Sequence, residues 1–227
     1  MPIAKVSVIG ATGDEGFGLA SRWAKAGIEV VIGSRDAERG QAAAESLTEL
    51  IPEAQATGLE NTEAAAACDL VVVTVPFSGQ AGIYRSIADH VNDGAIVVDC
   101  TVPVAAAVGG KPSAVLGVWE GSAAQQVAAL LPKGVALVAA FHSLAAAALN
   151  DLDYEFDSDV LVCGPKKAKP VVKELVETIP NLRYVDAGPL STARIVEPIT
   201  ALLIGINHRY GTDRSGIRIT DIEGGPK

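Results

Sequence analysis

The chain alternates between short apolar runs and segments in which apolar residues recur every three or four positions. The apolar runs span residues 3–9, 29–32, 69–75, 95–98, 134–141, 159–163 and 182–185. Runs of this length are typical of strands that are buried on both faces of a parallel sheet. Between them, residues such as Leu19, Trp23 and Ala26 have helical spacing. The alternation predicts an α/β fold, a Rossmann-type doubly wound parallel sheet.

The later part of the chain carries weaker patterns. We expect His142 and Ser143 to open an alanine-rich helix after the sixth strand, and residues 191–210 to form an apolar helix kinked at Pro198. Asn61 is expected to cap the helix over residues 62–67. The connection over residues 105–120 is long for a compact domain, so we expect a binding loop or a disordered segment.

Three glycines follow the first strand, at Gly10, Gly13 and Gly16, and a helix pattern begins directly after them. Glycines at this spacing allow a tight turn, a close approach of a pyrophosphate and close packing of helix on strand. The helix N-terminus then offers N–H groups to the phosphates. The turn therefore predicts a dinucleotide site, although tight turns with a purely structural role also use glycine.

The second strand ends at Gly33 and is followed by Ser34 and Arg35, with Arg39 one helical turn later. Proteins that bind NAD place an acidic residue here, against the ribose 2′-hydroxyl. Guanidinium groups instead pair with phosphate oxygens, so the sequence favours NADP over NAD. The alternative is a solvated helix start in which these arginines accompany Asp36 and Glu38.

The strand over residues 69–75 ends at Thr74, Val75 and Pro76. Its carboxyl end should lie near the point where the strand order of the sheet reverses, and doubly wound sheets bind ligands at this point. We therefore expect these three residues to line the cofactor cleft, which is compatible with the simpler role of closing a buried strand.

Composition narrows the class of protein. The chain is 49% hydrophobic and 4% aromatic and carries a net charge of −9, which argues against nucleic acid as a partner. Residues 135–149 are apolar but interrupted by His142 and Ser143, and they fall short of the roughly 20 residues that a membrane span needs. No secretory signal is visible, and the cysteines Cys68, Cys100 and Cys163 follow no disulfide pattern. We expect reduced, buried thiols in a cytoplasmic protein without membrane partners.

Familiar catalytic residues are missing. No tyrosine is followed four positions later by lysine, so the acid/base pair of short-chain dehydrogenases is absent. The histidines at positions 90, 142 and 208 are dispersed, so we expect no metal site. Reducing a carbonyl requires a proton donor, whereas hydride transfer between two conjugated heterocycles depends mainly on binding and alignment. The chain suits the second kind of reaction.

The motifs together resemble a known family, the F420-dependent NADP oxidoreductases, which move hydride between NADPH and the deazaflavin coenzyme F420. The resemblance covers nearly the whole length. It rests on Gly10–Gly13, Gly33–Arg35, Thr74–Pro76, Val102–Val104, Trp119–Ala124, Cys163–Gly164, Asp186–Leu190 and Gly216–Ile219.

The resemblance implies specific roles. Thr12, Ser34, Arg35 and Arg39 would hold the 2′-phosphate, and His142 and Leu144 would lie at the deazaflavin ring. The implied NADP-binding set is Gly10, Thr12, Gly13, Asp14, Glu15, Gly16, Ser34, Arg35, Arg39, Thr74, Val75, Pro76, Val102 and Ala146. By the same resemblance, residues 1–140 would form the nucleotide domain, and residues 141–227 a smaller domain completing the acceptor cleft.

Several points stay open. The family is typically dimeric, and the apolar helix over residues 195–206 is a plausible contact surface. The acceptor's anionic tail could meet either of two basic groups, Lys166, Lys167 and Lys169 or Arg209, Arg214 and Arg218. Reduction of a flavin or another small acceptor, or a nonenzymatic NADP sensor, remain alternatives to F420 reduction.

Overall fold

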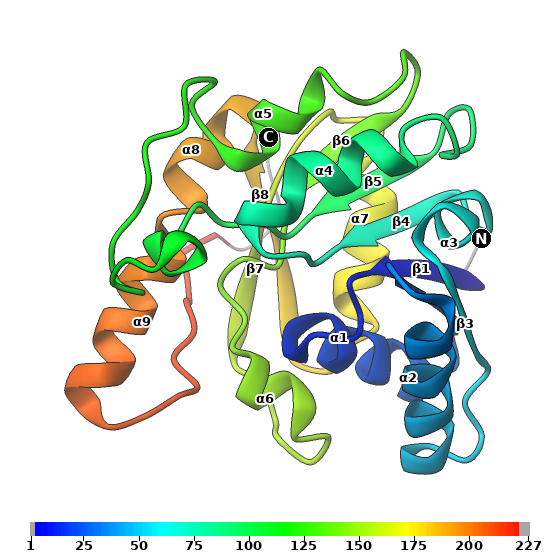
Figure 1. Ribbon diagram of the computed structural model, residues 1–227. Coiled ribbons are helices and arrows are strands. Elements are labelled where there is room, and N and C mark those ends of the chain that lie inside the picture. Colours follow the sequence, from blue (N-terminus) through cyan, green and yellow to red (C-terminus); the bar gives the residue numbers. More distant parts are fainter. Residues whose placement is uncertain (1–2, 223–227) are drawn as a thin grey trace.

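The computed structural model describes residues 3–222 and contains one eight-stranded sheet (Figure 1). The strand order is β3-β2-β1-β4-β5-β6-β7-β8. The strands are β1 (Lys5–Ile9), β2 (Glu29–Ser34), β3 (Ala56–Glu60), β4 (Leu70–Val73), β5 (Ile96–Asp99), β6 (Ala136–Ala139), β7 (Ser158–Cys163) and β8 (Leu182–Gly188). The strands expected from the apolar runs are therefore present.

Helices cover both faces of this sheet. They are α1 (Asp14–Lys25), α2 (Ala37–Leu50), α3 (Asn61–Ala66), α4 (Phe77–Ile87), α5 (Ala123–Ala128), α6 (Ala146–Asn150), α7 (Lys169–Glu177), α8 (Ala193–Val196) and α9 (Ile199–Tyr210), with 3-10 turns η1 (Ala105–Val108) and η2 (Leu190–Thr192). Successive strand residues point to opposite faces. In β1, Val8 therefore packs in the cluster that includes residues of α1, α2, α6 and α7, and Ile9 packs with residues of α3, α4 and α5. Burial on both sides explains the continuous apolar runs.

The strand order reverses between β1 and β4. The chain passes from β1 outward through β2 to β3, and then returns to place β4 on the other side of β1. The backbone N–H of Thr74 donates to the Ile9 carbonyl at 2.9 Å, so the carboxyl ends of β1 and β4 are joined directly. The glycine turn and the Thr74–Pro76 segment therefore meet at this switch point, as the sequence predicts.

The last two strands run against the others. β1 to β6 pair in parallel, as expected, but β6 and β7 are antiparallel and β8 is parallel to β7. The expected parallel sheet is therefore present in β1 to β6, and only the C-terminal strands β7 and β8 depart from that direction. Alternation of strands and helices does not encode direction, and here the connection containing α6 packs against α1, so β7 starts at the edge where β6 ends. The expected domain boundary at residue 141 falls in this connection.

Three local expectations are also corrected. Residues 142–145 form a turn, and the alanine-rich helix begins only at Ala146. Glu60, not Asn61, caps α3 by accepting a hydrogen bond from the Thr62 N–H at 2.9 Å. The helix expected over residues 191–210 is divided into η2, α8 and α9, because Pro198 cannot donate the hydrogen bond that would continue α8.

Among residues 3–222, no helix combines the length and the apolar character needed to cross a bilayer. Figure 1 shows α9 at the margin of the molecule, away from the sheet and beside the segment that contains η1. Leu202 on α9 is 61% exposed to solvent, and Ile195 on the preceding helix α8 is 64% exposed.

Candidate nucleotide and acceptor cleft

A cleft of about 1150 Å³ lies over the switch point, at the carboxyl ends of β1, β2, β4 and β5. This volume lies above the range that is usual for a site that binds one small molecule. The cleft therefore has room for more than one ligand. Fourteen of the expected site residues line it: Gly10, Thr12, Gly13, Asp14, Glu15, Ser34, Arg35, Arg39, Thr74, Val75, Pro76, Val102, His142 and Leu144. Gly16 and Ala146 are not among the lining residues.

The three glycines of the turn differ in what the absence of a side chain allows. Gly10 has φ +89°, a left-handed conformation that disfavours a side chain. A Cβ on Gly16 would lie 2.4 Å from the Thr74 Oγ1, so this glycine permits close packing of α1 on the end of β4. A Cβ on Gly13 would meet only the Gly10 carbonyl at 3.4 Å, an ordinary contact. Nothing in the chain itself requires glycine at position 13, whereas a ligand approaching the backbone there would.

The start of α1 is suited to an anion. Gly13 caps the helix without a side chain, so no side chain occupies the first-turn N–H groups that face the cleft. These groups and the helix dipole favour negative charge, as in other dinucleotide sites. The site fits a pyrophosphate.

The end of the cleft at β2 carries exposed positive charge. Arg35 and Arg39 line the cleft and are solvent-exposed, and neither forms an ion pair within residues 3–222. Asp36 does not neutralise them by pairing, because its carboxylate caps α2 through the Glu38 N–H at 2.9 Å. Ser34 is buried at the strand end and lines the cleft. The arrangement fits a phosphate monoester and not a ribose hydroxyl that needs a carboxylate.

The opposite end of the cleft is buried. His142 is only 4% exposed, yet neither ring nitrogen has a hydrogen-bond partner among the described residues. Burial lowers the pKa of His142 to about 4, so the ring is neutral at pH 7. Since buried polar atoms are nearly always paired, a ligand in the cleft is the natural partner for this ring.

The backbone around His142 is held from both sides. Phe141 adopts φ 68°, an uncommon conformation for a residue with a side chain, and its ring packs edge-on against Trp23 with centroids 5.6 Å apart. The carbonyl of His142 accepts a hydrogen bond from the Thr200 Oγ1 at 2.6 Å, which links the turn to the start of α9. The ring position is therefore set by contacts from α1 and α9.

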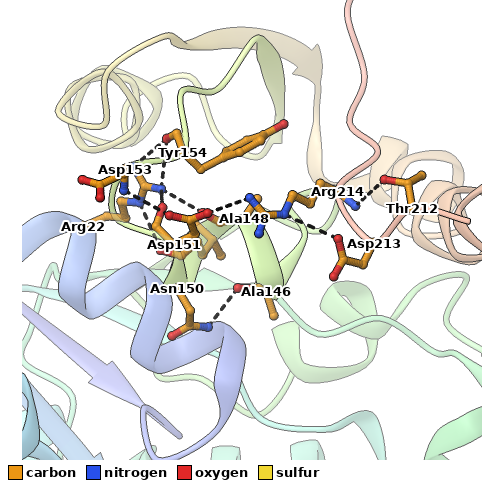
Figure 2. A network of polar contacts seen from close by, with 11 residues as sticks. Arg22, Ala146, Ala148, Asn150, Asp151, Asp153, Tyr154, Thr212, Asp213 and Arg214 are labelled. Atoms are coloured by element: carbon orange, nitrogen blue, oxygen red, sulfur yellow. Dashed lines mark hydrogen bonds and ion pairs between the residues drawn. The ribbon is translucent and has the colours of Figure 1, made fainter.

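A network behind this turn fixes α6 against α1 (Figure 2). The guanidinium of Arg22, 7% exposed, donates to the carbonyls of Ala148, Leu149 and Tyr154 at 2.8, 3.0 and 3.2 Å, and also to the Asp151 carbonyl. These carbonyls lie at the end of α6 and just after it, where helices leave acceptors unsatisfied. Arg22 thus caps α6 from a neighbouring helix.

Two further contacts tie residues of this region to other parts of the chain, and Figure 2 shows the one made by Asp151 and Arg214. The side-chain amide of Asn150 donates to the Asp14 carbonyl at 2.8 Å, at the start of α1. The Asp151 carboxylate pairs with Arg214 at 2.7 Å, which ties down the segment after α9. A Cβ on Gly18 would lie 2.6 Å from the Leu149 Cβ, so glycine there allows the close contact of α1 and α6.

Buried carboxylates lie beneath the same end of the cleft. Asp99, fully buried at the end of β5, accepts hydrogen bonds from Tyr84, Thr101 and Gln80 at 2.9, 2.7 and 3.1 Å. Burial raises its pKa to about 6 despite these donors. Glu197, also fully buried, accepts from the N–H groups of Ala123 and Ala124 at 2.7 and 3.0 Å, and burial raises its pKa to about 7.

Sequence reasoning missed part of the lining. One wall comes from α4 and includes Phe77, Ser78, Gly79, Gly82, Ile83 and Ser86, and Thr200 comes from α9. The wall could have been inferred from the position of α4 directly after Thr74–Pro76. Thr200 on α9 and Glu197 at the end of α8 gave no sequence signal, because only tertiary packing brings these two helices to the cleft region. All three cysteines are buried and free, as expected.

Neither group of basic residues considered for the acceptor tail lines the cleft. Lys169 is bound to Asp186, Arg214 to Asp151 and Arg218 to Asp157. These ion pairs give the three residues structural partners, and the basic residues that would meet the acceptor's tail stay a prediction.

Comparison with known proteins places these features in a family. A family profile described as "NADP oxidoreductase coenzyme F420-dependent" matches residues 5–103. An F420-dependent NADP reductase of Methanothermobacter thermautotrophicus is 42% identical over 224 residues, covering 97% of this chain and 96% of the relative. One from Methanocaldococcus jannaschii is 41% identical, covering 96% of this chain and 99% of the relative.

A solved structure extends the likeness to three dimensions. A protein of Arthrobacter sp. FB24 assigned as an F420-dependent NADP reductase superposes with a TM-score of 0.81 at 26% identity, covering 96% of this chain and all of that one. Sequence and structure agree over nearly the full length of each protein. The chain belongs to the family of F420-dependent NADP reductases.

Proposed function

We propose that this protein transfers hydride between NADPH and coenzyme F420, with both substrates bound in the cleft over the switch point. The observation that carries the proposal is the pairing, in one cleft, of a phosphate-binding end at β2 with a buried end where the His142 ring nitrogens lack partners. The first end suits NADPH and the second suits a planar heterocycle. The reaction conserves charge and electrons when a proton accompanies the hydride to the acceptor.

The chain's own residues provide binding and alignment in this proposal. The N-terminus of α1 holds the pyrophosphate, and Arg35 and Arg39 hold the 2′-phosphate. Thr74, Val75, Pro76, Val102 and Ala146 shape the nicotinamide half, and Gly16 belongs to the turn that receives the pyrophosphate. His142 and Leu144 meet the acceptor ring, and the neutral imidazole can donate or accept one hydrogen bond there. Residues 141–222 act as the smaller portion that completes the cleft.

We further propose a homodimer formed through the exposed side of α8 and α9. Ile195, Leu202 and Tyr210 are 64%, 61% and 80% exposed there, and exposed apolar surface of this kind favours association. Light scattering should give twice the monomer mass, and Leu202→Glu should shift the protein toward the monomer. A monomeric wild type would contradict this. The three free cysteines support a reducing compartment, the cytoplasm.

The reaction is tested by mixing purified protein with NADPH and F420 and following the visible absorbance of the oxidised deazaflavin. We expect bleaching that requires both protein and NADPH. A parallel sample with FMN separates F420 reduction from general flavin reduction. Equal rates with FMN would favour the broader reductase, and binding of NADPH without reaction of either acceptor would favour an NADP sensor.

A further inference from the structure

One acid in the cleft has a position that neither phosphate binding nor helix capping explains. Glu15 lies in the first turn of α1, lines the cleft and is partly exposed. Its carboxylate has no hydrogen bond or ion pair within residues 3–222. Its electrostatic neighbours are Asp99 and Cys100, at the end of β5. Glu15 therefore lies within electrostatic reach of the end of β5, on that side of the switch point.

The orientation of the nucleotide follows from the same cleft. With the 2′-phosphate at the end of β2 and the pyrophosphate at α1, the nicotinamide extends toward β4 and β5. Glu15 lies on this side. The reduced nicotinamide is neutral and the oxidised ring carries a positive charge, and the remainder of the two nucleotides is identical. A carboxylate near the ring therefore distinguishes the two oxidation states by charge alone.

We propose that Glu15 sets the relative affinity of the cleft for NADP⁺ and NADPH, with the ionised carboxylate favouring NADP⁺. This inference rests on the proposed function only in that NADP(H) occupies the cleft in the orientation above. It assigns Glu15 a role in nucleotide discrimination and none in the hydride transfer itself.

The protonation of Glu15 makes the effect depend on pH. Although Glu15 is partly exposed, desolvation of its carboxyl within the cleft, followed by repulsion from the nearby Asp99, raises its pKa to about 8. In the free protein the carboxyl is therefore largely protonated at pH 7. A cationic ring should lower this pKa, because it stabilises the ionised form. NADP⁺ binding should therefore release a proton between about pH 6 and 9 and tighten as pH rises, whereas NADPH binding should not.

Two other buried acids near the cleft titrate in or beside this window, Asp99 near pH 6 and Glu197 near pH 7, and the comparison with Glu15→Gln separates their contribution from that of Glu15. The charged or titratable residues that line it or lie directly behind Glu15 are Asp14, Arg35, Arg39, Glu60, Asp99, Cys100 and His142, with Glu197 beyond Asp99. His142 is neutral above its pKa of about 4, and the pKa of Cys100 lies well above its ordinary value. Asp99 titrates near pH 6, at the edge of the window. The 2′-phosphate is common to both nucleotides, so it cancels from their ratio.

The test is calorimetric titration of the full-length protein with NADP⁺ and with NADPH at pH 6.5 and pH 9. In the wild type, the ratio Kd(NADPH)/Kd(NADP⁺) should rise roughly tenfold over this range, about 1.4 kcal/mol. In Glu15→Gln the ratio should be nearly independent of pH and equal to the low-pH value of the wild type.

Two other variants calibrate the result. Asp14→Asn removes a neighbouring acid on the pyrophosphate side and should change both affinities by the same factor, leaving the ratio and its pH dependence intact. Glu63→Gln, on the exposed side of α3, should change neither affinity.

The outcomes separate this inference from the function. A pH-independent ratio in the wild type, or a Glu15→Gln ratio that follows the wild type, would overturn the role of Glu15 while leaving NADP(H) binding in place. Failure of the wild type to bind either nucleotide would overturn the proposed function, and this inference with it. Since the wild-type measurement needs no variant, poor folding of Glu15→Gln does not remove the test.

Discussion

The two ends of the cleft achieve binding in opposite ways. At the end of β2, Arg35 and Arg39 are exposed and unpaired within the described residues, and the segment that carries them is continuous in sequence. At the end of β5, Asp99 and His142 are buried, and the surrounding groups come from β5, β6, α1, α4 and α9. The first end depends on local sequence and the second on tertiary packing. Mutations at the two ends should therefore have different kinds of effect.

The largest difference should appear in folding stability. Arg22→Met removes the donor to four backbone carbonyls around the end of α6, and buried acceptors without partners are costly. We expect the free energy of unfolding to fall by about 3 kcal/mol, measured by urea denaturation. The KM for F420 should rise more than the Kd for NADPH, because α6 follows directly on the His142 turn.

Lys25→Met is the matched control for this variant. Lys25 lies on the same helix and donates to the Leu152 carbonyl at 2.9 Å, but it is exposed to solvent. Its loss should change stability by less than about 1 kcal/mol. Equal effects of the two substitutions would mean that the acceptor end does not depend on the buried network of Figure 2.

Loss of a phosphate contact should weaken binding without affecting folding. Arg35→Ala should raise the Kd for NADPH roughly 10- to 100-fold, because a hydrogen bond to a charged group contributes about 1.5–3 kcal/mol. The Kd for NADH and the unfolding midpoint should hardly change. Arg85→Ala, an exposed arginine on α4 outside the cleft, serves as control. Equal losses for NADPH and NADH would mean that Arg35 has a structural role.

The buried acids make stability depend on pH. Burial raises the pKa of Asp99 from its ordinary 3.8 to about 6, and that of Glu197 from 4.5 to about 7. At a pH between its unfolded and its folded pKa, each acid binds more protons in the folded protein than in the unfolded chain. The free energy of unfolding is therefore greatest at the acidic end of this range and falls as pH rises. From pH 5 to 7.5 the free energy of unfolding should fall by at least about 2 kcal/mol.

Urea titrations of the wild type and of a variant carrying Asp99→Asn and Glu197→Gln check this pH dependence. The variant should show a flatter profile from pH 5 to 7.5, and the slope that remains is due to Glu15, whose pKa is raised to about 8. Asp159 and Asp186 have lowered pKa values and lose their contribution only at more acidic pH, so they should not distort this window. Stability that increases with pH over the same range would contradict the account of the buried end.

The smallest effect should arise at the acceptor ring. His142→Ala should lower kcat/KM for F420 about tenfold, roughly 1.4 kcal/mol, while the Kd for NADPH stays nearly constant. His208→Ala, an exposed histidine at the end of α9, should leave both unchanged. If His142→Ala weakens NADPH as strongly as F420, the histidine does not contact the acceptor.

The same contrast explains how much the sequence could predict. The order of strands and helices, the glycine turn and the Ser34–Arg39 segment depend on local spacing, so periodicity and turn chemistry were sufficient to identify them. The reversed direction of β7, the turn at residues 142–145 and the burial of Glu197 depend on how distant segments pack. No local pattern encodes that Arg22 caps a helix more than 120 residues away.

The most direct test of the central claim is isotopic. If both substrates share one cleft, hydride should pass from NADPH to F420 without exchange with water. With NADPH carrying deuterium at both C4 positions, the reduced F420 formed in ordinary water should carry one deuterium, measured by mass spectrometry. Reduced F420 without deuterium would show that the hydride passes through an exchangeable intermediate, and it would contradict direct transfer within this cleft.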